Sequence, residues 1–95
     1  MIVEYARRAI LDLDGISNYY LSVADKRTAT KFAARFQVVI ERIARRPDSA
    51  RPVMERNGVR VVPLITFPYI VFYRVISPDR LRVLHVRHTA RLPWV

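Results

Sequence analysis

All six prolines of this 95-residue chain lie after residue 46, and this asymmetry divides the sequence into two halves. Proline interrupts helices and central strands, so closely spaced prolines restrict a segment to short elements, whereas a proline-free stretch can form long helices. The first half is such a stretch, and the second half consists of short apolar runs between prolines. The sequence therefore predicts helices followed by strands.

Two stretches of the first half carry an apolar residue at every third or fourth position, the spacing of one helix face. They span about residues 6–23 and 26–46. Asp25 is placed to cap the second helix, and Pro47 favours its end. Gly15 either weakens the first helix by about 1 kcal/mol relative to alanine or allows close approach of the second helix. We expect an antiparallel helical hairpin.

Four short segments have the composition of strands: Ile2–Tyr5, Val59–Leu64, Tyr69–Ile76 and Leu81–Arg87. Pro63 should place the second of these at an edge of the sheet or end it early. The third contains a single charged residue and should be buried on both faces. The order β-α-α-β-β-β indicates one α+β domain over residues 1–95, with the helical hairpin on one face of a mainly antiparallel sheet.

Strict alternation would divide the last strand between two faces. One face would carry Leu81, Val83, His85 and Arg87, and the other would carry Arg82, Leu84, Val86 and His88.

The chain is strongly basic, with 17 Lys and Arg against 8 Asp and Glu, and yet it is 52% apolar. A disordered basic tail would be poor in apolar residues, so the composition indicates a folded domain with a cationic surface. Such a surface suits a polyanionic or acidic partner. Fifteen of the cations are arginine, which favours bidentate contacts with phosphate or carboxylate but equally reflects a GC-rich genome.

Few catalytic arrangements are compatible with the sequence. It has no cysteine, no glycine-rich phosphate loop and only two histidines, so neither a metal site nor a cofactor is expected. Basic residues of the second half could bind phosphate and cleave RNA by acid–base chemistry, namely Arg60, Arg74, His85, Arg87 and His88. The alternative is structural: Arg74 pairs with an acid or lies along the sheet, and His85 is an ordinary core residue.

Several apolar side chains are not buried by any predicted element of the chain. Two helices cover one face of the sheet, which leaves the second face of Tyr69–Ile76 open. Leu11 and Tyr19 lie off the apolar stripe of the first helix, and the chain ends in Pro93-Trp94-Val95. A second copy of the chain or a partner that wraps around the domain would cover these surfaces.

The sequence gives no sign of a membrane or secretory protein. It lacks an apolar run of 18 residues, and its first residues do not resemble a signal peptide. We expect a soluble, cytoplasmic protein without a membrane partner.

The order of elements and two strings resemble the RelE/ParE superfamily of bacterial toxins, and the ParE branch in particular. The strings are Phe67–Val75 (FPYIVFYRV) and Val83–Arg91 (VLHVRHTAR). A spaced Ala/Phe pattern in the second helix, followed by an Arg-Pro break, matches as well.

This resemblance implies a toxin of a type II toxin–antitoxin system, held in a hetero-oligomeric complex by a cognate ParD-like antitoxin whose C-terminal segment wraps around it. ParE-like members inhibit DNA gyrase by binding, whereas RelE-like members cleave messenger RNA on the ribosome. Ile70 stands where RelE-like proteins usually carry an arginine, and the C-terminal tyrosine of that branch is absent. We therefore favour a gyrase inhibitor without catalytic activity, with the endoribonuclease as the alternative.

If the chain is a ParE-like toxin, the residue types that dominate protein interfaces predict which residues contact its partners. The antitoxin is expected to contact Leu11, Tyr19, Arg60, Arg74, Arg87 and Trp94. The target is expected to contact His88, Arg91 and Trp94. A third possibility, a nucleic-acid-binding module without toxicity, predicts strongly salt-dependent binding to DNA or RNA.

Overall fold

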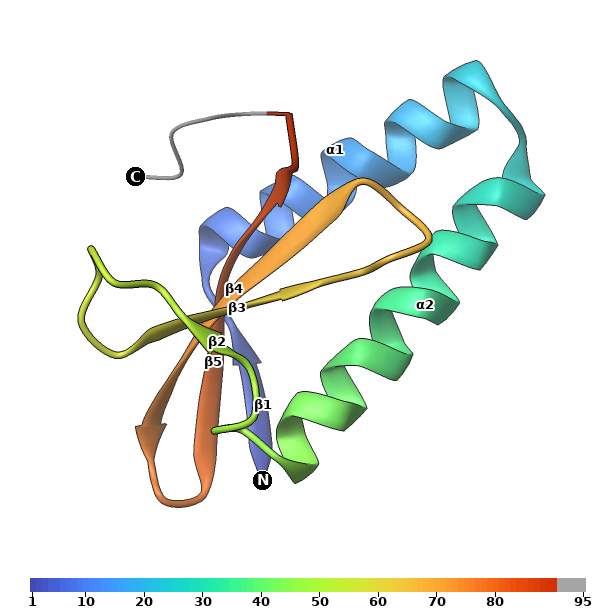
Figure 1. Cartoon of the computed structure of the whole chain (residues 1–95). Helices are drawn as coiled ribbons and strands as arrows, with labels where there is room; N and C mark the ends of the chain where they lie inside the picture. The colour runs from blue at the N-terminus through green and yellow to red at the C-terminus, as the bar shows by residue number, and fades with distance from the viewer. Residues whose placement is uncertain (91–95) are drawn as a thin grey trace.

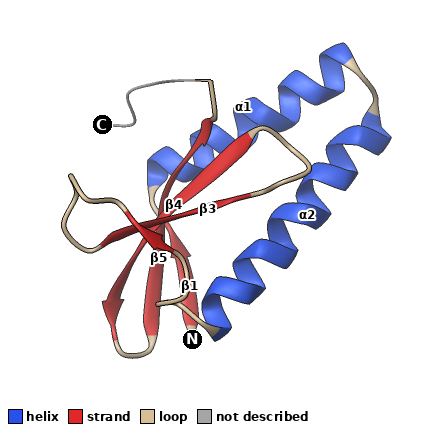
Figure 2. Ribbon diagram, in the orientation of Figure 1, coloured by secondary structure: helices blue, strands red, loops and turns tan. Residues whose placement is uncertain are grey.

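The computed structural model describes residues 1–90 and has the predicted α+β architecture (Figures 1 and 2). In chain order the elements are β1 (Ile2–Tyr5), α1 (Arg7–Val23), α2 (Lys26–Arg45), β2 (Arg51–Pro52), β3 (Val59–Pro63), β4 (Tyr69–Ser77) and β5 (Arg80–His88). The two helices form an antiparallel hairpin that packs on one side of the sheet, as expected (Figure 2).

The strands form one sheet in the order β1-β5-β4-β3-β2, in which β1 alone is parallel to its neighbour. The prediction of a mainly antiparallel sheet is thus confirmed. β3 ends at Pro63, in agreement with the early end predicted from that proline. The two-residue edge strand β2, which pairs Arg51 with Val61, was not predicted.

The start of α2 agrees with the predicted cap. The Asp25 carboxylate accepts a hydrogen bond from the Thr28 backbone N–H at 2.9 Å. This bond and a second from the Thr28 hydroxyl lower the pKa of Asp25. The helix ends at Arg45, shortly before Pro47, where the chain can no longer continue it.

The main core lies between the helices and the sheet. Phe32, Val39 and Ile43 of α2 pack with Val71 and Tyr73 of β4, and all five are almost completely buried. The Tyr73 hydroxyl donates to the Pro47 carbonyl at 2.6 Å. The polar end of the largest fully buried side chain is therefore satisfied, as a buried hydroxyl requires.

A second, smaller apolar cluster lies on the opposite face of the sheet. Val59, Val61, Ile70 and Phe72 form it, with Val53 and Leu84 packed against them. Val53 begins the loop of residues 53–58 between β2 and β3, which lies on the side of the sheet away from the helices (Figure 1). The chain itself thus covers part of the surface for which the sequence predicted a partner.

Burial of β4 on both faces is confirmed only for its first five residues. Tyr69–Tyr73 are buried, whereas Arg74, Val75 and Ile76 are exposed. The exposed part adjoins the turn to β5.

The predicted faces of β5 are wrong, because the strand contains an irregularity. Phe72 of β4 pairs with His85, but the next residue, Tyr73, pairs with Val83. Leu84 is therefore an extra residue, which reverses the alternation for the rest of the strand. His85 lies opposite Phe72 on the face away from the helices, whereas Val83 lies opposite Tyr73 on the helix face.

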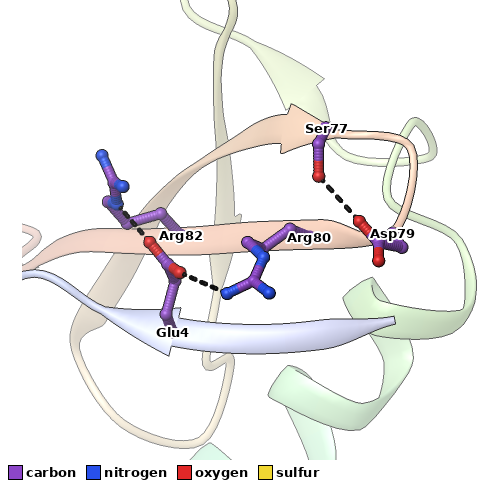
Figure 3. A network of polar contacts seen from close by, with 5 residues as sticks. All are labelled: Glu4, Ser77, Asp79, Arg80 and Arg82. Carbon is purple, nitrogen blue, oxygen red and sulfur yellow. Dashed lines mark hydrogen bonds and ion pairs between the residues drawn. The ribbon is translucent and has the colours of Figure 1, made fainter.

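β1 pairs with the first half of β5 only. Glu4 accepts hydrogen bonds from Arg80 at 3.2 Å and from Arg82 at 2.7 Å, which lower the pKa of the Glu4 carboxyl (Figure 3). The pairing begins with Ile2 opposite Arg80 and ends with Tyr5 opposite Val83. β5 therefore continues to His88 without β1 beside it.

Candidate functional site

A groove of about 720 Å³ lies between α1 and the part of β5 that extends past the end of β1. Most of its lining residues are apolar or aromatic, with Asp12 and His88 among them. The lining residues are Leu11, Asp12, Gly15, Ile16, Tyr19, Tyr20, Pro68, Tyr69, Val86, His88 and Ala90. Two residues predicted to contact a partner, Leu11 and Tyr19, are thus brought to the same groove and are 55% and 54% exposed.

Asp12 joins the two walls of the groove. One carboxylate oxygen accepts a hydrogen bond from the Val86 backbone N–H at 3.0 Å, and the other accepts from the Arg8 side chain at 3.1 Å. Val86 is nearly buried, and its N–H faces the helix where a neighbouring strand is missing. The Asp12 side chain thus takes the place of a strand carbonyl and satisfies the edge of β5.

Gly15 has a different role from the one considered in the sequence. A Cβ added at this position would meet no atom within 4 Å, so the glycine does not allow close approach of α2. It lines the groove instead, and its missing side chain leaves space there.

Aromatic rings form one end of the groove. Tyr20 has its ring centroid 5.6 Å from that of Phe67 and 6.4 Å from that of Tyr69. Tyr69 in turn lies edge-on to His88 at 5.3 Å. These rings are held by the core, so this end of the groove is a rigid apolar surface.

The basic residues proposed for RNA cleavage do not converge on one place. Arg74 pairs with Val59, and Arg87 pairs with Ile70, so both lie with His85 on the face away from the helices. Arg60 pairs with Tyr73 and His88 pairs with Tyr69, so both lie on the helix face.

Backbone contacts already engage some of these cations. Arg60 donates to the Ala50 carbonyl at 2.7 Å and fixes the start of β2. Arg74 donates to the Asn57 carbonyl at 3.3 Å and holds the end of the 53–58 loop. Both therefore support local structure.

His85 is the centre of a compact cluster on the face away from the helices. Its ring stacks on Phe72, with centroids 4.2 Å apart and planes 17° from parallel. Arg56 of the 53–58 loop donates to His85 Nε2 at 2.8 Å, and its guanidinium lies 5.8 Å from the Phe72 ring centroid. Because a guanidinium can only donate, the contact requires a neutral imidazole with its proton on Nδ1.

The surroundings of His85 favour this neutral form. Burial lowers its pKa from 6.5 to about 4, with the positive charges of Arg56 and Arg87 acting in the same direction. Arg8 adds weakly to this effect and Asp12 opposes it. Nδ1 is buried and has no hydrogen-bond partner among residues 1–90. At neutral pH the ring is therefore an acceptor for Arg56 and carries no charge.

Residues 1–90 contain no group of three His, Asp or Glu side chains placed to hold a metal ion. No helix in this range has the length and hydropathy needed to cross a membrane. Arg91 and Trp94, predicted as contact residues, lie outside the described residues.

Comparison with known proteins identifies the family. The family model for the ParE toxin of the type II toxin–antitoxin system parDE matches residues 3–93, nearly the whole chain. The chain belongs to the ParE toxin family. No match was found among curated protein sequences.

A solved structure shares the fold of this ParE-family chain. It is described as a chromosomal ParDE toxin–antitoxin system from P. aeruginosa and superposes with a TM-score of 0.78. The identity is 23%, over 93% of this chain and 95% of the other. The likeness supports the α+β arrangement derived above.

Two residues that shape the candidate site of this ParE-family protein were missed in the sequence. Neither Asp12 nor Arg56 was singled out in the sequence analysis. Their partners, Val86 and His85, are 74 and 29 positions away along the chain. No local pattern in the sequence indicates such contacts.

Replacing Asp12 should test its role as the substitute for a missing strand. The variant Asp12→Ala leaves the Val86 N–H without an acceptor, and we expect a loss of about 1–3 kcal/mol in unfolding free energy. The control Arg8→Ala removes only the exposed ion pair and should cost about 0.5 kcal/mol or less. Denaturant unfolding of the three proteins measures both, and equal losses would contradict the assignment.

The His85 cluster predicts a specific pH dependence. Below pH 6.5 the unfolded chain binds a proton at His85 that the folded chain refuses until about pH 4, so stability falls as pH decreases across this window. Because the ring is only partly buried, we expect a loss of about 1–2 kcal/mol from this group. The variant His85→Gln should show a correspondingly shallower decline in unfolding experiments; an unchanged slope would rule out the neutral-histidine arrangement.

Proposed function

We propose that this ParE-family chain inhibits DNA gyrase in the cytoplasm through protein contact and is neutralised by a cognate ParD-like antitoxin. The observation that carries the proposal is the distribution of the five basic residues over two faces of the sheet. Arg60 and His88 lie on the helix face, and Arg74, His85 and Arg87 on the other. An acid–base site for RNA cleavage requires such groups to meet around one phosphate.

The protonation state of His85 also argues against RNA cleavage. A general acid or base works best with a pKa near the operating pH, and the pKa of His85 is about 4. Its Nε2 is occupied by Arg56, and its Nδ1 is buried. The ring is therefore unsuited to transfer protons at neutral pH, which supports a toxin that acts by binding.

The groove beside α1 is the proposed binding site of the antitoxin. Leu11 and Tyr19 offer apolar contact there, and the part of β5 that β1 does not pair with forms the opposite wall. The net charge of +9 favours a segment with acidic residues. Such a segment would occupy the groove with its apolar residues and would reach Arg74 and Arg87 with its acids as it wraps around the sheet.

One observation favours the alternative, a RelE-type mRNA interferase. Arg56, Arg74 and Arg87 share the face away from the helices, where they could hold an RNA backbone. In that case His85 would have to exchange Arg56 for the substrate.

A pair of assays on the purified wild-type protein separates the two functions. We expect the protein to block DNA supercoiling by gyrase and to leave ribosome-bound messenger RNA intact. The variant His85→Gln should inhibit gyrase like the wild type, because the proposal gives this ring no part in target binding.

The opposite pattern would overturn the proposal. Messenger RNA cleavage that is lost in His85→Gln, together with normal supercoiling in the presence of the wild type, would establish the interferase. Tight, strongly salt-dependent binding to nucleic acid without either effect would indicate the third possibility, a binding module without toxicity.

A further inference from the structure

The turn between β3 and β4 contains a strained residue at its tip. Ile65 has a φ angle of 69°, the only positive value of a non-glycine residue among residues 1–90. The Thr66 N–H donates to the Leu64 carbonyl across it at 2.8 Å, which makes Ile65 the centre of a γ-turn. A β-branched residue is poorly suited to this conformation, which glycine or asparagine adopts at much lower cost.

Packing within the chain does not compensate for this strain. The Ile65 side chain is 70% exposed, so it contributes little to the core. Strained residues persist mainly where function requires them, and an isoleucine that neither suits its backbone nor fills the core meets that description.

The surrounding structure holds the tip rigidly. Leu64 is completely buried, and its carbonyl accepts a hydrogen bond from the Arg35 side chain at 2.9 Å. On the other side of Ile65, the Phe67 ring packs edge-on against Phe32 of α2, with centroids 5.4 Å apart. Pro68 then restricts the chain as it enters β4. Ile65 is therefore presented outward from a fixed backbone, so little conformational entropy is lost when it binds.

The chemistry of the tip indicates what it binds. No charged residue occurs between Val61 and Tyr73, although 26% of the chain is charged. The exposed positions of the turn are Pro63, Ile65, Thr66 and Pro68. A nucleic-acid contact would be expected to use the abundant arginines, whereas this surface offers a single projecting aliphatic side chain.

We propose that Ile65 is the anchor of a docking surface and inserts into a preformed apolar pocket on the folded protein that this toxin inhibits. A projecting side chain requires a partner with a pocket, which a folded protein provides and an extended antitoxin segment does not. Ile65 is also absent from the residues that line the α1–β5 groove. The inference rests on the proposed function in that the toxin acts by protein contact, but it does not depend on the target being gyrase.

The variants Ile65→Gly and Ile65→Asn test this directly, because both residues suit a positive φ angle. We expect a melting temperature equal to or above that of the wild type. We also expect at least a tenfold rise in the concentration needed to inhibit supercoiling and loss of growth arrest at equal expression level. Met54→Ala removes a side chain that is 88% exposed in the 53–58 loop and should behave like the wild type.

The other possible outcomes would each overturn the inference, the proposed target or both. Growth arrest by Ile65→Gly equal to that of the wild type overturns the inference, as does a melting temperature more than 5 °C lower. If sedimentation shows a wild-type dimer and a monomeric Ile65→Gly variant, the pocket belongs to a second copy and the inference is also wrong. A wild type that arrests growth without inhibiting gyrase refutes the proposed target alone; one that arrests no growth refutes both.

Discussion

The hydrogen bond from the Val86 backbone to the Asp12 carboxylate is the contact on which the candidate site depends. β1 pairs with β5 only as far as Val83, so the rest of β5 would present an unsatisfied edge. Asp12 satisfies this edge at one point and holds α1 against the strand. A longer β1 would have filled the space, and a helix without this carboxylate would have left the buried N–H without a partner. The groove exists because one side chain replaces a strand.

The extra residue in β5 has an equally large effect on chemistry. Leu84 reverses the alternation of the strand, so that His85 and Arg87 meet Arg56 on the face away from the helices, while His88 remains beside the groove. Without it, the two histidines would have exchanged faces. The irregularity thus separates a groove lined largely by aromatic and apolar residues from a cationic face whose histidine is held neutral. This separation is the main physical support for a toxin that acts by binding.

Much of the fold was predictable because local rules act strongly on this sequence. The apolar spacing of the helices, the Asp25 cap and the break at Pro63 all depend on neighbouring residues, and all are found in the structure. The features that the sequence did not predict depend on pairing between distant segments. Nothing near Leu84 indicates a shift of register, the two residues of β2 are too few to form a pattern, and Arg56 acquires its role only when its loop folds over Phe72. Leu11 and Tyr19 were predicted as contact residues, but the groove that joins them depends on Asp12, which was not recognised.

We propose that the groove between α1 and the part of β5 that extends past β1 receives the antitoxin. The most direct measurement is photo-crosslinking with p-benzoylphenylalanine, introduced either at Tyr19 in the groove or at Met54 in the loop on the opposite face, in complexes with the cognate antitoxin. We predict a strong crosslink to the antitoxin from position 19 and a weaker one from position 54, which the segment would pass only where its acids reach Arg74. Crosslinking from position 54 with none from position 19 would show that the antitoxin does not bind in this groove.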